Sequence, residues 1–321
     1  MNEFELIDRF FRHCGARRTD VALGVGDDAA LLACPPDEEL VAAIDTLVEG
    51  RHFPKGSPPN SIGYRALAVN LSDLAAMGAK PAWALLALTL TQADEPWLTA
   101  FAAGFGRLAR IHGVALVGGD TTAGPLSTTV QMLGHVPKGK ALRRRGGRPG
   151  DILFVSGTPG DAAAGLAIEQ GRLQAHDADR DHYLRERFLF PTPRVELGQR
   201  LRDYASACID ISDGLLGDAG KLAVASGCGV EIAFFKLPLS APLTAAVGDE
   251  RARELALTGG DDYELCFTVP PDALAALQRD LPQEKWGYRA IGALSAAPGS
   301  VVVRDGTVME FSHRGFDHFS P

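Results

Sequence analysis

Apolar positions in the first half of the chain come in short runs with a strand period and longer runs with a helix period. Pro58 and Pro59 precede one long helical run, and Gly78 lies near its end, as expected for helix boundaries. Strand and helix runs follow one another, which predicts a mixed α/β fold. The predicted strands are 40–47, 82–91, 114–120 and 127–136, and the predicted helices are 59–78 and 95–112.

The pattern is interrupted at 138–150 (KGKALRRRGGRPG), which is rich in glycine, arginine and proline and has no apolar period. We interpret this segment as a linker or mobile loop between an N-terminal domain, 1–137, and a C-terminal domain, 151–321. The second half again mixes strands with helices, so both domains are expected to be α/β. Its predicted strands are 152–157, 207–212, 230–234, 263–269 and 301–306, with helices after the GTPGD turn and at 214–226.

Composition narrows the class of protein. Of the 321 residues, 46% are apolar and 22% are charged, and the formal charge is −8, so we expect no nucleic-acid partner. The longest apolar stretch, 82–88, is too short to span a bilayer, and the first ten residues do not resemble a signal peptide. The five cysteines form no CxxC pair. We therefore expect a cytoplasmic protein with no membrane partner and reduced cysteines.

One pattern recurs along the chain: an aspartate stands where an apolar run meets glycine or a turn. Taken singly, each aspartate is more often a turn or capping residue. Together they favour another interpretation, because too few basic residues lie near them in sequence to pair them all, and clustered carboxylates need a counter-charge. Oxygen ligands of this kind suit Mg²⁺. The candidates are Asp27, Asp28, Asp45, Asp73, Asp120, Asp210, Asp213, Asp261 and Asp262.

Glycine-rich turns accompany several of these aspartates. GVGDD, VGGDTT, SGTPGD and TGGDD could each present backbone N–H groups to a phosphate, and SGTPGD leads directly into a predicted helix. GHVPKGKA (134–141) resembles a P-loop but has Ala141 where a magnesium-binding hydroxyl is required, so we reject it. His52 lies in a polar turn, where contact with an anionic substrate and a plain surface position are equally expected. No arrangement typical of covalent catalysis is found.

Taken in order, these motifs resemble the thiamine-monophosphate kinase family. The segments that carry the resemblance span nearly the whole chain, and the third and seventh are the most specific: GVGDDAALL, DTLVEGRHF, ALAVNLSDLAAMGAKPAW, VGGDTT, GTPGDAAAGLAI, IDISDGL, GGDDYELCFTV and GFDHF. The resemblance implies the two-domain fold of aminoimidazole ribonucleotide synthetase and a homodimer. It also implies transfer of the γ-phosphoryl group of ATP to thiamine monophosphate. An anionic phosphate oxygen is the acceptor, so metal ions and positioning supply the catalysis and no covalent intermediate is needed.

The resemblance also implies roles for single residues. Several magnesium ions would be held by Asp27, Asp28, Asp45, Asp73, Asp120, Asp210 and Asp213. ATP would contact Gly119, Asp120, Arg144 and Ser212. Thiamine monophosphate would contact His52, Asp261 and Phe316, the last as an aromatic face for a cationic ring. The chain departs from the family pattern at Ala43 and Ile44, where hydroxyl side chains are common, and at Asp261, where glutamate is common.

Two alternatives remain open from the sequence. A selenophosphate synthetase-like enzyme shares the fold but needs a reactive Cys beside a Lys, and Cys14 in RHCGAR has no such neighbour. A non-catalytic thiamine-phosphate or nucleotide-binding protein would not need so many candidate metal ligands. Turnover of ATP that requires both magnesium and thiamine monophosphate separates these hypotheses.

Overall fold

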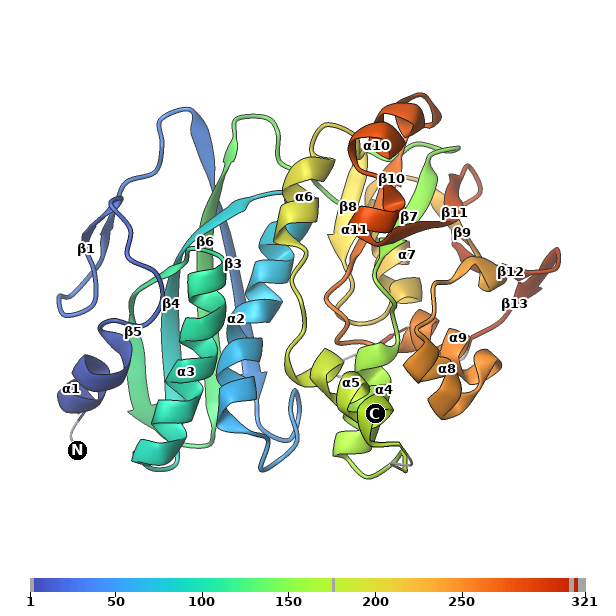
Figure 1. Ribbon diagram of the computed structural model, residues 1–321. Coiled ribbons are helices and arrows are strands. Elements are labelled where there is room, and N and C mark those ends of the chain that lie inside the picture. The colour runs from blue at the N-terminus through green and yellow to red at the C-terminus, as the bar shows by residue number, and fades with distance from the viewer. Residues whose placement is uncertain (1–2, 175–176, 312–314, 317–321) are drawn as a thin grey trace. The chain divides into compact units, whose positions relative to one another are not determined.

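Helices pack against β-sheets in both halves of the chain, as the computed structural model shows for residues 3–174, 177–311 and 315–316 (Figure 1). The chain divides into two units: unit 1 is Met1–Leu74 with Ala79–Lys140, and unit 2 is Ala75–Gly78 with Ala141–Pro321. The predicted α/β class is confirmed in each. No helix in the described ranges is long and apolar enough to cross a bilayer.

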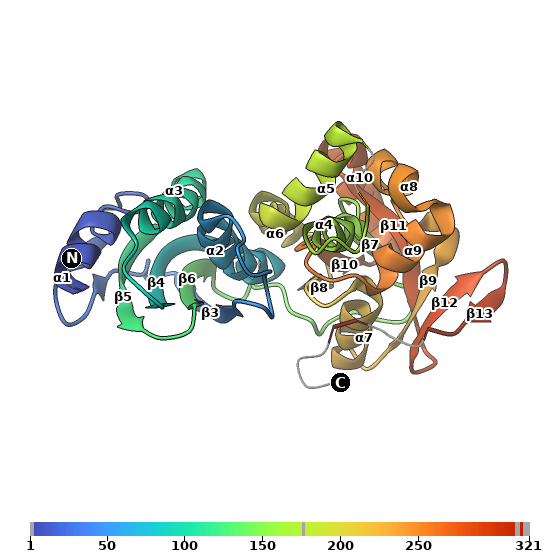
Figure 2. The ribbon, with the colours of Figure 1, turned by 90° about the horizontal axis from the view of Figure 1, so that it is seen from below.

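Unit 1 contains a four-stranded sheet of order β3-β6-β4-β5, in which only β4 and β5 are parallel. Helices α2 and α3 cover one face of this sheet (Figure 2). All six predicted elements are present, with ends that differ by a few residues, the usual uncertainty of helix and strand boundaries. The bounds are β3 Glu38–Val48, α2 Pro59–Ala76, β4 Lys80–Leu90, α3 Glu95–Ile111, β5 Ala115–Ala123 and β6 Ser127–Pro137.

Two glycines let α2 and α3 approach backbone to backbone. A methyl group on Gly104 would lie 1.8 Å from the carbonyl oxygen of Asn60, and one on Gly63 would lie 2.2 Å from that of Phe101. Real side chains do not come this close, so both positions require glycine. The close contact fixes α2 against α3, and α2 carries one of the predicted metal ligands, Asp73.

The opposite face of this sheet is only partly covered. The short hairpin of β1 (Val21–Leu23) and β2 (Leu31–Leu32) packs Val21 and Leu32 against Trp83. On the edge strand β3, however, every fourth residue carries an exposed apolar side chain on this face: Leu40, Ile44 and Val48 are 56%, 64% and 38% exposed. The sequence did not predict the hairpin or the N-terminal turns, α1 (Glu3–Leu6) and a π-helical turn (Ile7–Phe11).

Unit 2 contains a seven-stranded sheet of order β13-β12-β9-β11-β7-β10-β8. Helix α7 packs against one face of this sheet, and α4, α5, α8 and α9 lie together below the strands in Figure 1. The main core forms between α7 and the sheet, with Leu216, Leu222 and Ile209 among its buried members. The bounds are β7 Ile152–Ser156, α4 Asp161–Glu169, α5 Ala178–Leu189, α6 Val195–Leu201, β8 Ala207–Asp210, α7 Leu215–Ala225, β9 Gly229–Ala233, α8 Ala241–Val247, α9 Asp249–Thr258, β10 Leu265–Val269, α10 Leu274–Asp280, α11 Gln283–Trp286, β11 Tyr288–Ser295, β12 Ser300–Arg304 and β13 Thr307–Met309, with 3₁₀ turns at Phe234–Lys236 and Pro271–Ala273.

The arginine- and glycine-rich segment 141–150 has no helix or strand, but backbone hydrogen bonds hold it to unit 2. The carbonyl oxygen of Arg143 accepts from the N–H of Cys208 at 2.8 Å, and the N–H of Gly150 donates to Leu294 at 2.9 Å. The side chain of Leu142 is buried. These bonds fix the course of the segment over the surface of unit 2.

Candidate functional site

Four predicted site residues of unit 1 line one cavity of about 670 Å³: Asp27, Asp28, Gly119 and Asp120. Asp27 and Asp28 lie in the loop after β1, and all three carboxylates are exposed. Gly119 is required because a side chain there would collide with the carbonyl oxygen of Leu86 on β4, 1.8 Å away. We predicted a glycine turn at VGGDTT, but β5 continues through it to Ala123, so Asp120 is a strand residue.

Asp45 on β3 and Asp73 on α2 lie together, and both are half-buried. Burial raises the pKa of the Asp45 carboxyl, and a side-chain hydrogen bond with Asp73 offsets only part of this rise. Two carboxyl groups in contact cannot both stay ionised unless a proton or a cation is shared between them. This pair is therefore the arrangement in unit 1 that most favours a bound cation.

The strand register separates the pair from Asp120. Asp45 and Leu86 both lie opposite Val130, which is buried beneath the helices, so Asp45 is on the covered face. Asp120 lies opposite Ala87, one residue along, and side chains alternate between faces. Within the described residues, no group of three or more His, Cys, Asp or Glu side chains could hold a metal ion. The register thus places Asp45 and Asp120 on opposite faces of the sheet.

His52 lies in the turn after β3 and is half-buried. The ring Nδ1 accepts the backbone N–H of Val48 at 3.0 Å, and the backbone N–H of His52 donates to the Val48 carbonyl oxygen at 2.9 Å. Because Nδ1 is an acceptor, a neutral His52 carries its proton on Nε2. The ring is therefore fixed in orientation by the turn.

In unit 2, the structure brings together four predicted residues of different roles. The N–H of Asp261 donates to the carbonyl oxygen of Ser212 at 2.8 Å, and the N–H of Phe316 donates to that of Asp213 at 2.9 Å. Asp210 is buried at the end of β8, opposite Leu265. Ser212, Asp213, Asp261 and Phe316 therefore meet where β8 ends and α7 begins. The remainder of the GFDHF motif, 317–319, lies outside the described residues.

Two residues of this region were missed in the sequence. The buried Asp218 accepts backbone N–H bonds from Ser212, Asp213 and Gly214 at 3.0 to 3.2 Å, which fixes the loop before α7. Lys221 contacts Asp213 at 2.6 Å and Asp218 at 2.8 Å. Burial alone would lower the pKa of Lys221, but the hydrogen bonds to the two aspartates raise it. The sequence offered one signal for Asp218: it is an aspartate on the apolar face of the predicted helix 214–226.

One predicted phosphate cradle is already filled by the protein. At the SGTPGD turn, the N–H groups of Gly160 and Ala162 donate to the two carboxylate oxygens of Asp262 at 2.7 and 3.2 Å. These are the N-terminal donors of α4 that a phosphate would need. The prediction of a phosphate site at SGTPGD is therefore wrong, and the anion bound there is a side chain.

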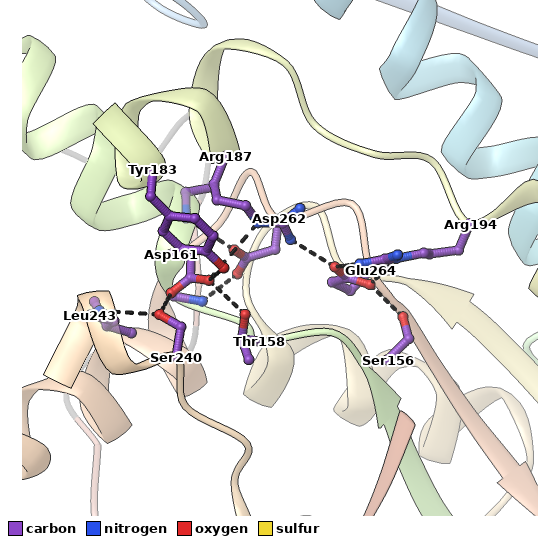
Figure 3. Close-up of polar contacts among 12 residues, drawn as sticks. Ser156, Thr158, Asp161, Tyr183, Arg187, Arg194, Ser240, Leu243, Asp262 and Glu264 are labelled. Atoms are coloured by element: carbon purple, nitrogen blue, oxygen red, sulfur yellow. Dashed lines mark hydrogen bonds and ion pairs between the residues drawn. The ribbon is translucent and has the colours of Figure 1, made fainter. Parts of the chain in front are cut away.

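Asp262 belongs to a buried polar network that the sequence did not reveal (Figure 3). Arg194 binds the carboxylate of Glu264 through two bonds of 2.6 Å, and Arg187 adds one of 2.7 Å. Burial alone would raise the pKa of Glu264, but Arg194 and Arg187 lower it to about 2. Asp161 accepts hydroxyl bonds from three further residues, Thr158, Tyr183 and Ser240. The two arginines lie on α5 and just before α6, where nothing in the sequence marked them.

Arg144, the predicted nucleotide residue of the basic segment, is exposed. Its carbonyl oxygen accepts the hydroxyl of Ser226, at the C-terminal end of α7. Ser212 precedes the N-terminal end of the same helix, so about 16 Å of helix lies between these two contacts at 1.5 Å per residue. Within unit 2, the backbone of Arg144 therefore lies apart from the Ser212 loop.

Comparisons with known proteins cover both units. Residues 26–136 match the family model of the AIR synthase related protein, N-terminal domain, and residues 148–305 match that of the C-terminal domain. Solved HypE hydrogenase maturation proteins share the fold, for example at a TM-score of 0.74 and 23% identity over 97% of this chain and 96% of that chain. The predicted aminoimidazole ribonucleotide synthetase-like fold is thus confirmed.

Closer relatives share one name. The thiamine-monophosphate kinase of Salmonella typhimurium is 50% identical over 99% of this chain and 98% of the relative, and that of Escherichia coli K12 is 49% identical over the same shares. The crystal structure of the Stenotrophomonas maltophilia thiamine-monophosphate kinase has a TM-score of 0.84 and 48% identity, covering 91% of this chain and 93% of that one. AaThiL complexed with AMPPCP and TMP has a TM-score of 0.77 and 33% identity, covering 89% of both chains.

Proposed function

The chain belongs to the thiamine-monophosphate kinase family, and we propose that it transfers the γ-phosphoryl group of ATP to thiamine monophosphate, giving ADP and thiamine diphosphate. The observation that carries this proposal is the match to kinases of that name at 50% identity over 99% of the chain. A relative of the same fold complexed with AMPPCP and TMP supports it further.

The chemistry suits an acidic site. An oxygen of the acceptor phosphate forms a bond to the γ-phosphorus, and the bond from that phosphorus to the β–γ bridging oxygen breaks, leaving its electron pair on ADP. The acceptor is already an anion, so no side chain has to remove a proton. The barrier lies in bringing two anions together, and positive charge and positioning must lower it.

We propose that the acidic residues hold magnesium ions. Carboxylate oxygens are the ligands this metal prefers, and the contact between Asp45 and Asp73 requires a shared proton or cation. Bound there, magnesium neutralises phosphate oxygens and the charge that develops during transfer. The ligands in this proposal are Asp27, Asp28, Asp45, Asp73, Asp120, Asp210 and Asp213.

The remaining residues bind the two substrates in this proposal. Gly119, Asp120, Ser212 and Arg144 contact ATP, with the guanidinium of Arg144 pairing with phosphate oxygens. His52, Asp261 and Phe316 contact thiamine monophosphate, and the 46% exposed Phe316 is accessible to a cationic ring. The meeting of Ser212, Asp213, Asp261 and Phe316 in unit 2 supports a site where both substrates are held.

A homodimer completes the proposal. The edge strand β3 presents Leu40, Ile44 and Val48 on the partly covered face of its sheet, an apolar stripe that suits a two-fold contact with the same strand of a second copy. Light scattering should give about twice the 34.0 kDa mass of the chain. Leu40→Glu should give the monomer mass. Val224→Glu, at an apolar position of α7 that is 76% exposed, is the matched control and should stay dimeric.

The direct test incubates purified protein with ATP, Mg²⁺ and thiamine monophosphate and follows ADP and thiamine diphosphate by chromatography. Equal amounts of both products are expected, with none after chelation by EDTA. Product formation that survives EDTA would refute the metal assignment. ADP without thiamine diphosphate would point to another acceptor.

A further inference from the structure

The segment 261–264 sends its side chains alternately to two sides. Asp262 and Glu264 enter the buried network, with exposures of 1% and 0%. Asp261 and Tyr263 lie together instead, with the Tyr263 hydroxyl 3.4 Å from Oδ1 of Asp261. Asp261, the residue proposed to contact thiamine monophosphate, is therefore followed directly by one buried anchor, and a second buried anchor lies three residues after it.

The first anchor is Asp262. Its carboxylate accepts the N–H groups of Gly160 and Ala162, so it is bound to the N-terminal end of α4. The two donors favour the charged carboxylate, but burial outweighs them and raises the pKa of Asp262 well above its usual range. Asp262 thus ties the segment to a rigid element by bonds that have a defined direction.

The second anchor is Glu264. It is bound by Arg194 through two bonds, by Arg187 through one and by the hydroxyl of Ser156 at 2.5 Å. A planar guanidinium fixes both the position and the rotation of a carboxylate that it binds bidentately. Figure 3 shows the two arginines meeting Glu264 from different sides. The anchor therefore has little freedom to turn.

The backbone beside the anchors is strained, both before Asp262 and between Asp262 and Glu264. Asp261 and Tyr263 have φ of 73° and 52°, in the left-handed region that non-glycine residues seldom adopt. Their N–H groups donate to the carbonyl oxygens of Ser212 and Ile211 at 2.8 Å each. Such a conformation persists only where the surroundings hold it, and it is found mainly at functional sites.

We infer that Asp262 and Glu264 are positioning residues that hold Asp261 in the orientation needed to bind thiamine monophosphate. They act through the backbone of 261–264 and touch no substrate. The inference rests on the proposed role of Asp261 in the kinase reaction. In the GGDDYEL motif, Asp262 and Glu264 would thus anchor the backbone, and Asp261, just before them, would bind the substrate.

The test compares Asp262→Asn and Glu264→Gln with Asp161→Asn as matched control. Asp161 lies in the same network and is fully buried, but its hydrogen bonds go to Thr158, Tyr183 and Ser240, and its ion pair with Arg187 is longer, at 3.9 Å. For the first two variants, KM for thiamine monophosphate should rise about tenfold while KM for ATP changes less than about twofold. The control should lose thermal stability and keep the ratio of the two KM values. Arg194→Lys, which keeps the charge but loses the fork, serves if Glu264→Gln does not fold.

Two results would overturn the inference. One is an equal rise of both KM values, and the other is the same change of ratio in Asp161→Asn, since either marks a general loss of stability. Hydrogen exchange in the peptide 259–265 is a readout independent of activity and should be faster in Asp262→Asn than in the control. Unchanged exchange refutes the anchoring. A wild-type protein that forms no thiamine diphosphate but shows this exchange difference would refute the proposed function and leave the anchoring intact.

Discussion

The carboxyl groups of unit 1 and those of the buried network in unit 2 are chemically the same but have different partners. In unit 2, Glu264 is neutralised by two arginines, and Asp262 accepts two backbone N–H bonds at the N-terminus of a helix. In unit 1, Asp45 and Asp73 meet each other, and Asp27, Asp28 and Asp120 face a cavity. The first set has its hydrogen-bond partners within the protein, whereas we propose that the second set receives positive charge from a bound cation.

This difference helps to distinguish aspartate and glutamate residues that stabilise the fold from those that serve function. A buried carboxylate with several fixed donors stabilises the fold, and its loss leaves those donors unpaired. Carboxyl groups placed against one another cannot all stay ionised without a shared proton or cation, which makes them candidate cation ligands. Substitution should therefore chiefly lower stability in the buried network of unit 2 and chiefly lower activity at the acids of unit 1.

The largest expected effect is on activity in unit 1. Asp73→Asn should lower kcat/KM on the order of a thousandfold, because a metal ligand and a stabilising charge are lost together. The melting temperature should change little, since an asparagine can keep the side-chain hydrogen bond with Asp45. Steady-state kinetics and calorimetry measure the two quantities. Near-normal activity would remove Asp73 from the metal site.

The second effect is on stability in unit 2. Glu264→Ala should lower the free energy of unfolding by about 3–5 kcal/mol, because Arg187 and Arg194 lose their buried partner. Urea denaturation measures this change. Glu231→Ala, an exposed glutamate on β9, is the control and should change stability by about 0.5 kcal/mol or less. A loss as small as that of the control would show that the network is not needed for the fold.

The third effect is on the pH dependence of stability. Glu264 has a pKa of about 2 in the folded protein and 4.5 as the reference value, so its contribution is complete above pH 4.5 and is lost as the pH falls toward 2. Between pH 6 and pH 3 the wild type should lose roughly 2 kcal/mol more stability than Glu264→Gln. Parallel losses in both proteins would mean that the Glu264 carboxylate is not held in its charged form.

The smallest effect concerns the basic segment. Arg144→Ala should raise KM for ATP about tenfold and KM for thiamine monophosphate much less, since one phosphate contact is lost. Arg145→Ala, an exposed neighbour, is the matched control. If KM for thiamine monophosphate rises more than that for ATP, Arg144 does not belong to the nucleotide site.

Much of the fold was predictable because apolar periodicity is strong in the elements that form the two cores. β11 was missed because Gly292 breaks its apolar pattern, yet the sheet needs glycine there, since a side chain would collide with the carbonyl oxygen of Glu231. The polar helix α5 was missed because its residues face a network of charges, and Arg187 acquires its partner only through tertiary contact.

The site was predictable only as far as local motifs define it. The aspartates stood out in the sequence, but which of them meet depends on strand register, as Asp45 and Asp120 show. SGTPGD failed for a related reason: a glycine turn before a helix binds any anion, and here the anion is the side chain of Asp262. A motif specifies the chemistry of a site, and the fold decides what occupies it.

The backbone contact between α2 and α3 has a consequence for how the protein can evolve. One added methyl group at Gly63 or Gly104 would force the helices apart, and α2 carries Asp73 to its meeting with Asp45. A substitution at the helix contact would thus change the position of Asp73 relative to Asp45. These two glycines, which have no chemistry of their own, should be as intolerant of mutation as the acids themselves.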